Sequence, residues 1–134
     1  NIDGLHQKAG SRRVLELHGS VLRNFCQKCG AFHGLEAITG STGVPRCDCG
    51  GIIKPDVVLY EEGLDENVIA ASVSAIRHAD VLIIAGTSLT VYPAAGLVNY
   101  YRGSKLVVIN KTELSGTGAD LTINAPVGQV LEQV

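Results

Sequence analysis

The cysteines are the residues whose types and spacing most clearly predict chemistry, because all four lie in one stretch as two close pairs. Cys26 and Cys29 form a CxxC pair, Cys47 and Cys49 form a CxC pair, and residues 30–46 separate them. Two such pairs on one loop bring four thiolates to a point, the arrangement that tetrahedral zinc requires. Four protein ligands leave no position for water or substrate, so the pattern predicts a structural zinc rather than a catalytic one.

Two disulfides are the competing interpretation of the same residues, and free thiols are a third. No segment resembles a signal peptide, and the composition gives no reason to expect an oxidising compartment, so zinc is favoured. His33 lies near the cysteines, but four sulfurs already fill the shell, which leaves it only as an alternate ligand.

Composition limits the remaining possibilities. The chain has 134 residues, of which 46% are hydrophobic, enough for one main core beside a zinc module. A net charge of −2 provides no basic field for nucleic acid and no polybasic membrane patch. No apolar run approaches the ~20 residues of a membrane span, so we expect a cytoplasmic protein without nucleic-acid or membrane partners. Because the sequence begins at Asn1 rather than Met, we expect it to be part of a longer protein.

The elements expected in the first half are short. Leu5 to Ala9 could form a helix closed by Gly10. Alternating apolar and polar residues predict a strand over residues 14–21, broken near Gly19, which would put His18 at a strand end. A further extended segment is expected at residues 56–60, where β-branched residues are frequent and the acids that follow end it.

The period changes in the second half. Apolar residues recur at helical spacing from Asp65 to Ala79, and a continuous apolar run over residues 80–86 is typical of a fully buried parallel strand. Further elements are expected in this order: a loop at 87–90, a helix at 92–101, a buried strand at 105–110, a short strand at 121–123 and a last helix from about Val127. Strands alternating with helices predict right-handed βαβ units and a parallel sheet.

Ligands of such sheets bind beyond the carboxyl ends of the strands. This rule places Gly86, Thr87, Ser88 and Asn110 on the functional edge, where small residues would admit a nucleotide and hydroxyl groups would contact it. There is no GxGxxG motif, however. From the residues alone, Gly86–Ser88 is equally well interpreted as an ordinary strand-to-helix turn, and Asn110 as a turn residue.

Several segments together carry a resemblance to a known family. They are NIDGLH at the N-terminus, LHG around His18, the two cysteine pairs, KPDVVLY at 54–60, GTSLTVYP at 86–93 and IN at 109–110. In this order they resemble the sirtuin family, and the compact zinc module is similar to that of bacterial members. The resemblance implies an α/β fold: a Rossmann-like parallel sheet with helices on its faces, interrupted by a small zinc-ribbon module. It also implies an NAD-binding domain at residues 1–23 and 55–134 and a zinc-binding module at 24–54.

Sirtuins are NAD-dependent protein-lysine deacylases, which release nicotinamide and O-acyl-ADP-ribose, so the resemblance implies NAD, zinc and an acyl-lysine protein or peptide as partners. His18 would be the general base for a ribose hydroxyl, acting after nicotinamide has been displaced. Asn1 and Asp3 would lie in the nicotinamide and ribose pocket. Gly86, Thr87, Ser88 and Asn110 would contact the rest of NAD. The residues expected to flank an extended substrate peptide are Val57, Val58, Leu59, Tyr60, Val91 and Tyr92.

The sequence also departs from the family. The N-terminal Gly-Ala-Gly cofactor loop of sirtuins is not in it, so we expect this C-terminal part alone to be inactive and to bind NAD weakly or not at all. Exposed apolar strand faces would then favour self-association. Glu61 stands where many relatives have Gly, and the CxC pair is unusually tight. Two other functions stay open: a non-enzymatic zinc-ribbon module that binds proteins, and an NAD-dependent protein ADP-ribosyltransferase.

Overall fold

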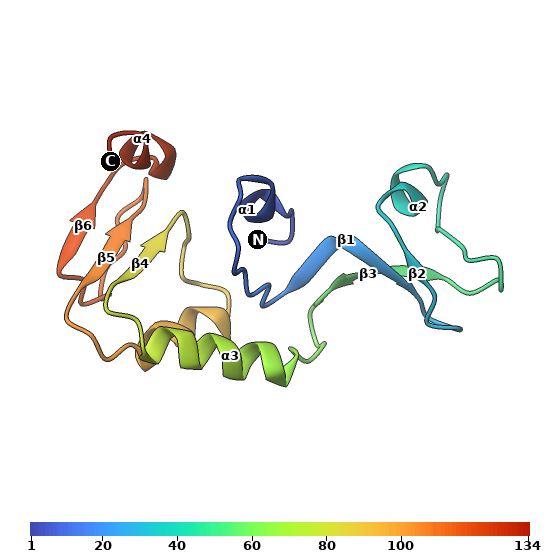
Figure 1. The fold of residues 1–134 in the computed structure, drawn as a ribbon, viewed down its shortest axis with the longest axis horizontal. Helices are drawn as coiled ribbons and strands as arrows, with labels where there is room; N and C mark the ends of the chain where they lie inside the picture. The colour runs from blue at the N-terminus through green and yellow to red at the C-terminus, as the bar shows by residue number, and fades with distance from the viewer. The chain divides into compact units, whose positions relative to one another are not determined.

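The computed structural model describes all residues, Asn1 to Val134, as two compact units. The first unit is Asn1–Val68 and the second is Ile69–Val134. Figure 1 follows the chain through the elements of both units. No helix is long and apolar enough to cross a membrane.

The first unit is built on an antiparallel sheet with the strand order β2-β1-β3. The central strand β1 (Gly19–Cys26) pairs with β2 (Phe32–His33) on one side and β3 (Ile53–Val57) on the other. Two one-turn helices, α1 (Leu5–Lys8) and α2 (Glu36–Thr39), precede and follow this strand pair along the chain. The side chains of Ser20, Asn24 and Cys26 on β1 are buried, as expected for alternate residues of a strand with one covered face.

A bulge interrupts the pairing of β1 with β3. Ser20 lies opposite Asp56, yet Asn24 already lies opposite Pro55, so residues 21–23 have no partners on β3. Pro55 has no N–H to donate to the ladder, and a proline is tolerated here because the pairing is already irregular at the bulge. The buried Asn24 amide compensates by donating to the carbonyl oxygens of Val21, His33 and Gly34. The bulge therefore frees Val21 and Arg23 for other contacts, which shape the site below.

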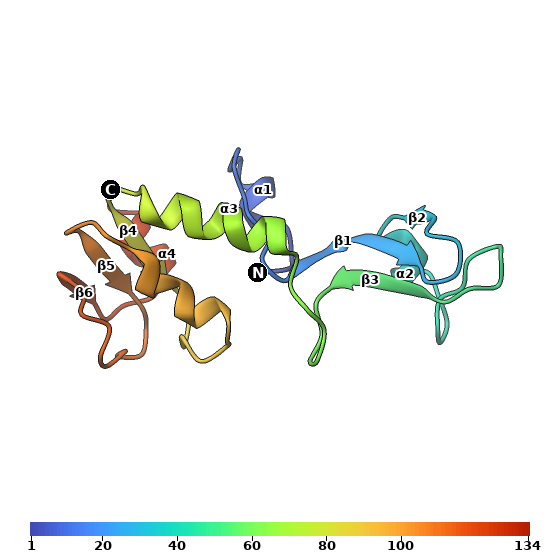
Figure 2. The ribbon, with the colours of Figure 1, turned by 90° about the horizontal axis from the view of Figure 1, so that it is seen from below.

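The second unit contains the predicted parallel sheet. β5 (Leu106–Ile109) lies between β4 (Leu82–Ala85) and β6 (Leu121–Ile123), as Figure 2 shows. Val108 in the central strand is completely buried, and this strand forms the core of the unit. A 3₁₀-helix, η1 (Ala94–Tyr100), follows β4, and α4 (Val127–Leu131) follows β6. The predicted α/β class, with a parallel sheet in the order of the sequence, is thus confirmed.

The long helix α3 (Glu66–Arg77) runs from the end of the first unit into the second. It begins where predicted, because the Asp65 carboxylate accepts the N–H groups of Asn67 and Val68 and so satisfies two free donors of the first turn. The predicted helix and strands at Leu5, residues 82–85, 106–109 and 121–123 are also confirmed. The expected domain boundaries at residues 23/24 and 54/55 stay a prediction. The two compact units are defined by the density of contacts within each, and this division does not show where a ligand-binding domain begins or ends.

Some expected elements are wrong in position or type. The strand expected at residues 14–21 begins only at Gly19, because the Gly19 N–H closes a turn on the Glu16 carbonyl. The extended segment expected at 56–60 ends at Val57, because Leu59 and Glu62 form a turn. The helix expected at residues 92–101 is confirmed, as the 3₁₀-helix η1. β4 is not buried on both faces: it is an edge strand, and Ile83 is 53% exposed.

Candidate functional site

The four cysteines come together as predicted. Their sulfur atoms all lie within 4.8 Å of one another. The Cys26 and Cys49 sulfurs are 3.4 Å apart and those of Cys29 and Cys47 are 3.7 Å apart. Neither pair is a disulfide. Four sulfurs at ~2.3 Å from a tetrahedral zinc would be about 3.8 Å apart, so the cluster fits this ion closely.

The pKa values of the cysteine thiols also indicate that the cluster binds a cation. Backbone N–H groups of Cys29 and Lys28 lower the pKa of the Cys26 thiol to about 6, which favours the thiolate that zinc binds. The pKa of Cys49 is raised to about 12: the Gly51 N–H lowers it, but the Cys26 and Cys29 side chains raise it more. Thiols packed this closely cannot all ionise unless a cation neutralises them.

Local backbone geometry shapes this metal centre. A Cβ on Gly51 would lie 2.6 Å from the Cys26 sulfur, so only glycine fits beside the ligand. Gly50 has a φ of 80°, which closes the turn after the second pair. The metal-ligating cluster does not include His33, whose Nε2 atom is buried without a hydrogen-bond partner. The ligand set is therefore Cys₄, which is characteristic of a structural site.

His18 lies in a turn that enters β1, not at the end of a strand. The turn runs from Glu16 to Gly19, with the Gly19 N–H donating to the Glu16 carbonyl at 2.9 Å. The His18 carbonyl accepts the Val58 N–H at 3.1 Å, which fixes the turn against the end of β3. Gly19 has a φ of 78°, and a Cβ there would lie 1.9 Å from the Asp56 carbonyl oxygen. Only glycine allows this approach, so the backbone around the half-buried His18 is closely defined.

The N-terminal segment is attached to the same strand. The Val21 N–H, freed by the bulge, donates to the Ile2 carbonyl at 3.0 Å. The Asp3 carboxylate accepts the Leu5 N–H at 3.0 Å at the start of α1. Asn1 and Asp3 are both exposed. Both residues therefore lie on a segment that is hydrogen-bonded to β1 at Val21, which is three residues after His18 in the sequence.

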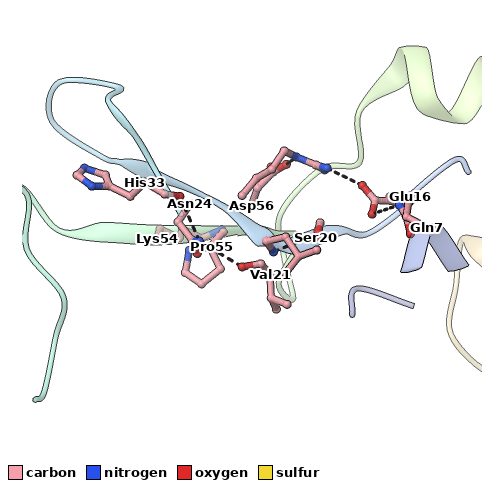
Figure 3. Close-up of polar contacts among 11 residues, drawn as sticks. Gln7, Glu16, Ser20, Val21, Asn24, His33, Lys54, Pro55 and Asp56 are labelled. Carbon is pink, nitrogen blue, oxygen red and sulfur yellow. Dashed lines mark hydrogen bonds and ion pairs between the residues drawn. The ribbon is translucent and has the colours of Figure 1, made fainter. Parts of the chain in front are cut away.

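Sequence reasoning missed the ionic network next to this turn. Arg23 donates to Glu16 at 2.6 Å and to Asp56 at 2.9 Å. Gln7 donates to Glu16 at 2.7 Å, and Figure 3 shows these two side chains facing each other. The Arg23 hydrogen bond holds the pKa of Glu16 below its usual value. The position of Glu16, two residues before His18, was the only signal in the sequence. The strand expected at residues 14–21 gives no reason to connect Glu16 with Arg23.

In the second unit, the predicted residues Gly86, Thr87, Ser88 and Asn110 line one pocket of about 670 Å³. It opens beyond the carboxyl ends of β4 and β5, because Gly86 follows β4 and Asn110 follows β5. Gly86 has a φ of 60°, and the nearest atom to a Cβ there would be 3.8 Å away. Further residues complete the lining: Lys111, Thr112, Leu114, Pro126, Val127 and Gly128. The four residues selected from the sequence are therefore brought together.

Hydrogen bonds hold the polar groups of this pocket. The Thr87 hydroxyl accepts the Leu89 N–H at 3.1 Å, and the hydroxyls of Ser88 and Thr90 are 2.7 Å apart. The Asn110 amide donates to the Thr112 carbonyl at 2.7 Å, which orients its oxygen. A concave site with hydroxyls, an amide and backbone at the end of a parallel sheet has the chemistry to bind a nucleotide.

The residues expected to flank a peptide lie on both units. Val57 ends β3 and Val58 is hydrogen-bonded to the His18 carbonyl. Leu59 is 57% exposed and Tyr60 is fully exposed. Val91 and Tyr92, in the second unit, are 60% and 76% exposed. Apolar side chains with this exposure are free to contact another chain.

Comparison with known proteins agrees with this arrangement. The sequence model of the Sir2 family matches residues 1–93. An NAD-dependent protein deacetylase of Clostridium perfringens is 61% identical over 137 aligned residues, which include 100% of this chain and 56% of that protein. A solved complex of Sir2 with a p53 peptide and NAD⁺ superposes with a TM-score of 0.89 at 37% identity, over 100% of this chain and 59% of the other. A complex with 2′-O-acetyl-ADP-ribose and a deacetylated p53 peptide gives the same score at 36% identity, over 100% of this chain and 60% of the other.

The second unit has a parallel sheet with a pocket at its strand ends, and the first unit has a Cys₄ cluster beside an antiparallel sheet. These features define an α/β protein with a structural metal module. The chain belongs to the Sir2 family, the sirtuins, as the family match over residues 1–93 shows. It spans a little more than half the length of the curated relatives it matches.

Proposed function

We propose that this chain is part of an NAD-dependent protein-lysine deacylase, which transfers the acyl group of an acyl-lysine to NAD-derived ADP-ribose and releases nicotinamide. The observation that carries the proposal is the single pocket formed by Gly86, Thr87, Ser88 and Asn110 at the ends of the parallel strands. The relatives described above are NAD-dependent protein deacetylases, and one of the solved complexes contains both NAD⁺ and a peptide.

In this proposal the pocket of the second unit holds NAD. The Thr87 and Ser88 hydroxyls and the Gly86 backbone bind its phosphates and ribose, and the oriented Asn110 amide binds the adenosine ribose. NAD supplies the ribosyl carbon that accepts the acyl oxygen when nicotinamide leaves. The second unit therefore serves binding and orientation.

The first unit supplies the reactive groups. The His18 imidazole takes the proton of a ribose hydroxyl as a general base. The Asp3 carboxylate, beside Asn1, favours the positive charge that develops at the ribose. The exposed segment that ends at Tyr60 receives the acyl-lysine peptide as an added extended strand, in which main-chain pairing tolerates many substrate sequences.

The test measures nicotinamide release from NAD in the presence of an acetyl-lysine peptide. It compares the 134-residue chain with an extended protein, in which this sequence is preceded by the Gly-Ala-Gly region of a family member. We expect the extended protein to turn over and the shorter chain to be inactive, because the shorter chain lacks that loop. His18→Ala in the extended protein should abolish formation of deacetylated peptide.

The products separate the remaining alternatives. A gain of one ADP-ribose on the peptide or an added protein acceptor, without loss of acetyl, would show ADP-ribosyl transfer instead. No nicotinamide release with any acyl peptide would contradict the deacylase proposal and favour a zinc-containing binding module. Zinc content does not discriminate, since every one of these proteins would contain it.

Self-association of the 134-residue chain belongs to the same proposal. β4 is an edge strand in which Ile83 is 53% exposed, and Val81, just before it, is 46% exposed; such an apolar edge can pair with a second copy. We expect sedimentation to detect dimers that Ile83→Lys dissociates. A wild-type chain that is monomeric at high concentration would contradict this expectation.

A further inference from the structure

One side-chain network connects three segments that carry residues of the proposed reaction. Gln7 comes from α1, just after Asp3. Glu16 begins the turn that holds His18, and Asp56 lies on β3 immediately before the substrate segment. Arg23, in the bulge of β1, joins Glu16 to Asp56. Figure 3 shows the contact between Gln7 and Glu16.

The Glu16 carboxylate is the centre of this network. Its Oε1 accepts the Gln7 Nε2 hydrogen at 2.7 Å and its Oε2 accepts the Arg23 Nη1 hydrogen at 2.6 Å. Its side chain is only 11% exposed, so water competes little for either oxygen. Exposed ion pairs are usually weak and mobile, but a shielded carboxylate with both oxygens occupied is held in one geometry.

Arg23 fixes the other end. Its Nε donates to Asp56 Oδ2 at 2.9 Å while Nη1 holds Glu16, so two different nitrogens of one planar group set the spacing of two carboxylates. A lysine carries a single ammonium on a flexible stem and cannot reproduce this fork. The bulge is what frees Arg23 from the regular pairing of β1 with β3.

The network acts on the His18 turn from both sides. Glu16 is the first residue of the turn, and its carbonyl accepts the Gly19 N–H. At the other side Gly19 pairs with Val57, and Val58 donates to the His18 carbonyl, so this side depends on the position of β3. Both ends of the turn are therefore fixed by groups that the Arg23 network holds, although none of the network's hydrogen bonds involves the His18 ring.

We propose that Glu16 and Arg23 are positioning residues of the deacylation, which hold the His18 turn so that its imidazole stays at the ribose hydroxyl. The inference rests on the proposed function and names two residues that act through the backbone of His18. In that reaction His18 acts after nicotinamide has left. A displaced His18 therefore slows the release of deacetylated peptide, while the earlier, reversible loss of nicotinamide continues.

The test uses the extended protein and measures two rates in each variant: formation of deacetylated peptide, and exchange of labelled nicotinamide into NAD. Glu16→Gln keeps the shape of the side chain but turns an amide NH₂ toward Gln7 or Arg23, which are themselves donors. Arg23→Lys keeps the positive charge but loses the two separate nitrogens that bind Glu16 and Asp56. Glu36→Gln is the matched control, because the exposed Glu36 carboxylate on α2 has no hydrogen bond or ion pair. Gln7→Ala removes one exposed hydrogen bond and should fold even where the others do not.

We expect kcat for deacetylation to fall about tenfold or more in Glu16→Gln and Arg23→Lys, since small errors in the position of a catalytic group are costly. Nicotinamide exchange and the peptide KM should change less than about twofold in the same variants. Gln7→Ala should show the same split with a smaller fall, and Glu36→Gln should match the wild type.

A parallel fall of both rates would show that the network only maintains the fold, and unchanged rates would show that it does not position His18; either result overturns the inference. A wild-type extended protein with neither exchange nor product would instead refute the proposed function itself. In that case the inference fails with it.

Discussion

Gly19→Ala is the substitution for which the structure predicts the clearest effect. A Cβ at this position would lie 1.9 Å from the Asp56 carbonyl oxygen and 2.9 Å from its carbonyl carbon. Both atoms are backbone of the paired strand β3, so neither can move away as a flexible side chain could. The φ of 78° is in addition a conformation that alanine rarely adopts.

The expected cost has two parts. The left-handed conformation costs alanine about 1–2 kcal/mol. Separating Gly19 from Asp56 also weakens the neighbouring hydrogen bonds from Gly19 to Glu16 and from Val58 to His18, each worth about 1 kcal/mol. We therefore expect Gly19→Ala to lower the free energy of unfolding by about 3–4 kcal/mol.

Gly10→Ala is the matched control. Gly10 has a φ of 93° and no atom within 4 Å of a built Cβ, so alanine there has the conformational cost without the clash. Urea denaturation of the zinc-loaded chain, followed by circular dichroism, should place Gly19→Ala about 2 kcal/mol below Gly10→Ala. Equal free energies for the two variants would refute the reasoning that close approach to Asp56 requires glycine.

Three further predictions concern other parts of the chain. Chelation, or Cys26→Ser, should remove one zinc per chain measured by mass spectrometry and unfold the zinc module, because its ligation contributes roughly 10–16 kcal/mol; an unchanged melting curve would contradict this. Arg23 lowers the pKa of Glu16 below 4.5, so this carboxylate stabilises the fold above that pH and the contribution disappears as the pH falls through the lowered folded-state pKa; acid titration of Glu16→Gln should therefore show a shallower loss of stability, and identical curves would disprove it. Glu61 has a φ of 70°, so Glu61→Gly should stabilise the chain by about 0.5–1 kcal/mol, whereas Glu66→Gly inside α3 should destabilise it by about 1 kcal/mol; urea midpoints that move in the same direction would count against this explanation.

Local patterns explain why so much of the second unit could be predicted. The apolar runs at residues 82–85 and 106–109 form the strands β4 and β5, as expected because short runs rich in β-branched residues are typical of parallel strands. The rule that ligands bind at the carboxyl ends of parallel strands then selected Gly86 and Asn110, which share a pocket. The prediction that β4 is buried on both faces was wrong, because the residues of a strand do not determine which elements pack against it.

The first unit was harder to predict around His18. The alternation over residues 14–21 indicated a strand, but it does not show that Gly19 begins β1 and closes a turn. Whether a short alternating segment forms a strand depends on a partner strand with free hydrogen-bonding groups, and β3 lies more than thirty residues away in the sequence. The link from Glu16 through Arg23 to Asp56 depends on that same distant pairing.

The sequence by itself determined the chemistry available to this protein: four cysteine ligands, an imidazole, and small polar residues after two apolar strands. These follow from residue type and short spacing, because ligand number and strand order are local properties. Only the tertiary structure decided how the His18 turn is held. The bulge of β1 against Pro55 frees Val21 to bind Ile2 and Arg23 to bind Glu16 and Asp56. Such contacts form only after distant strands have paired, so no local pattern contains them.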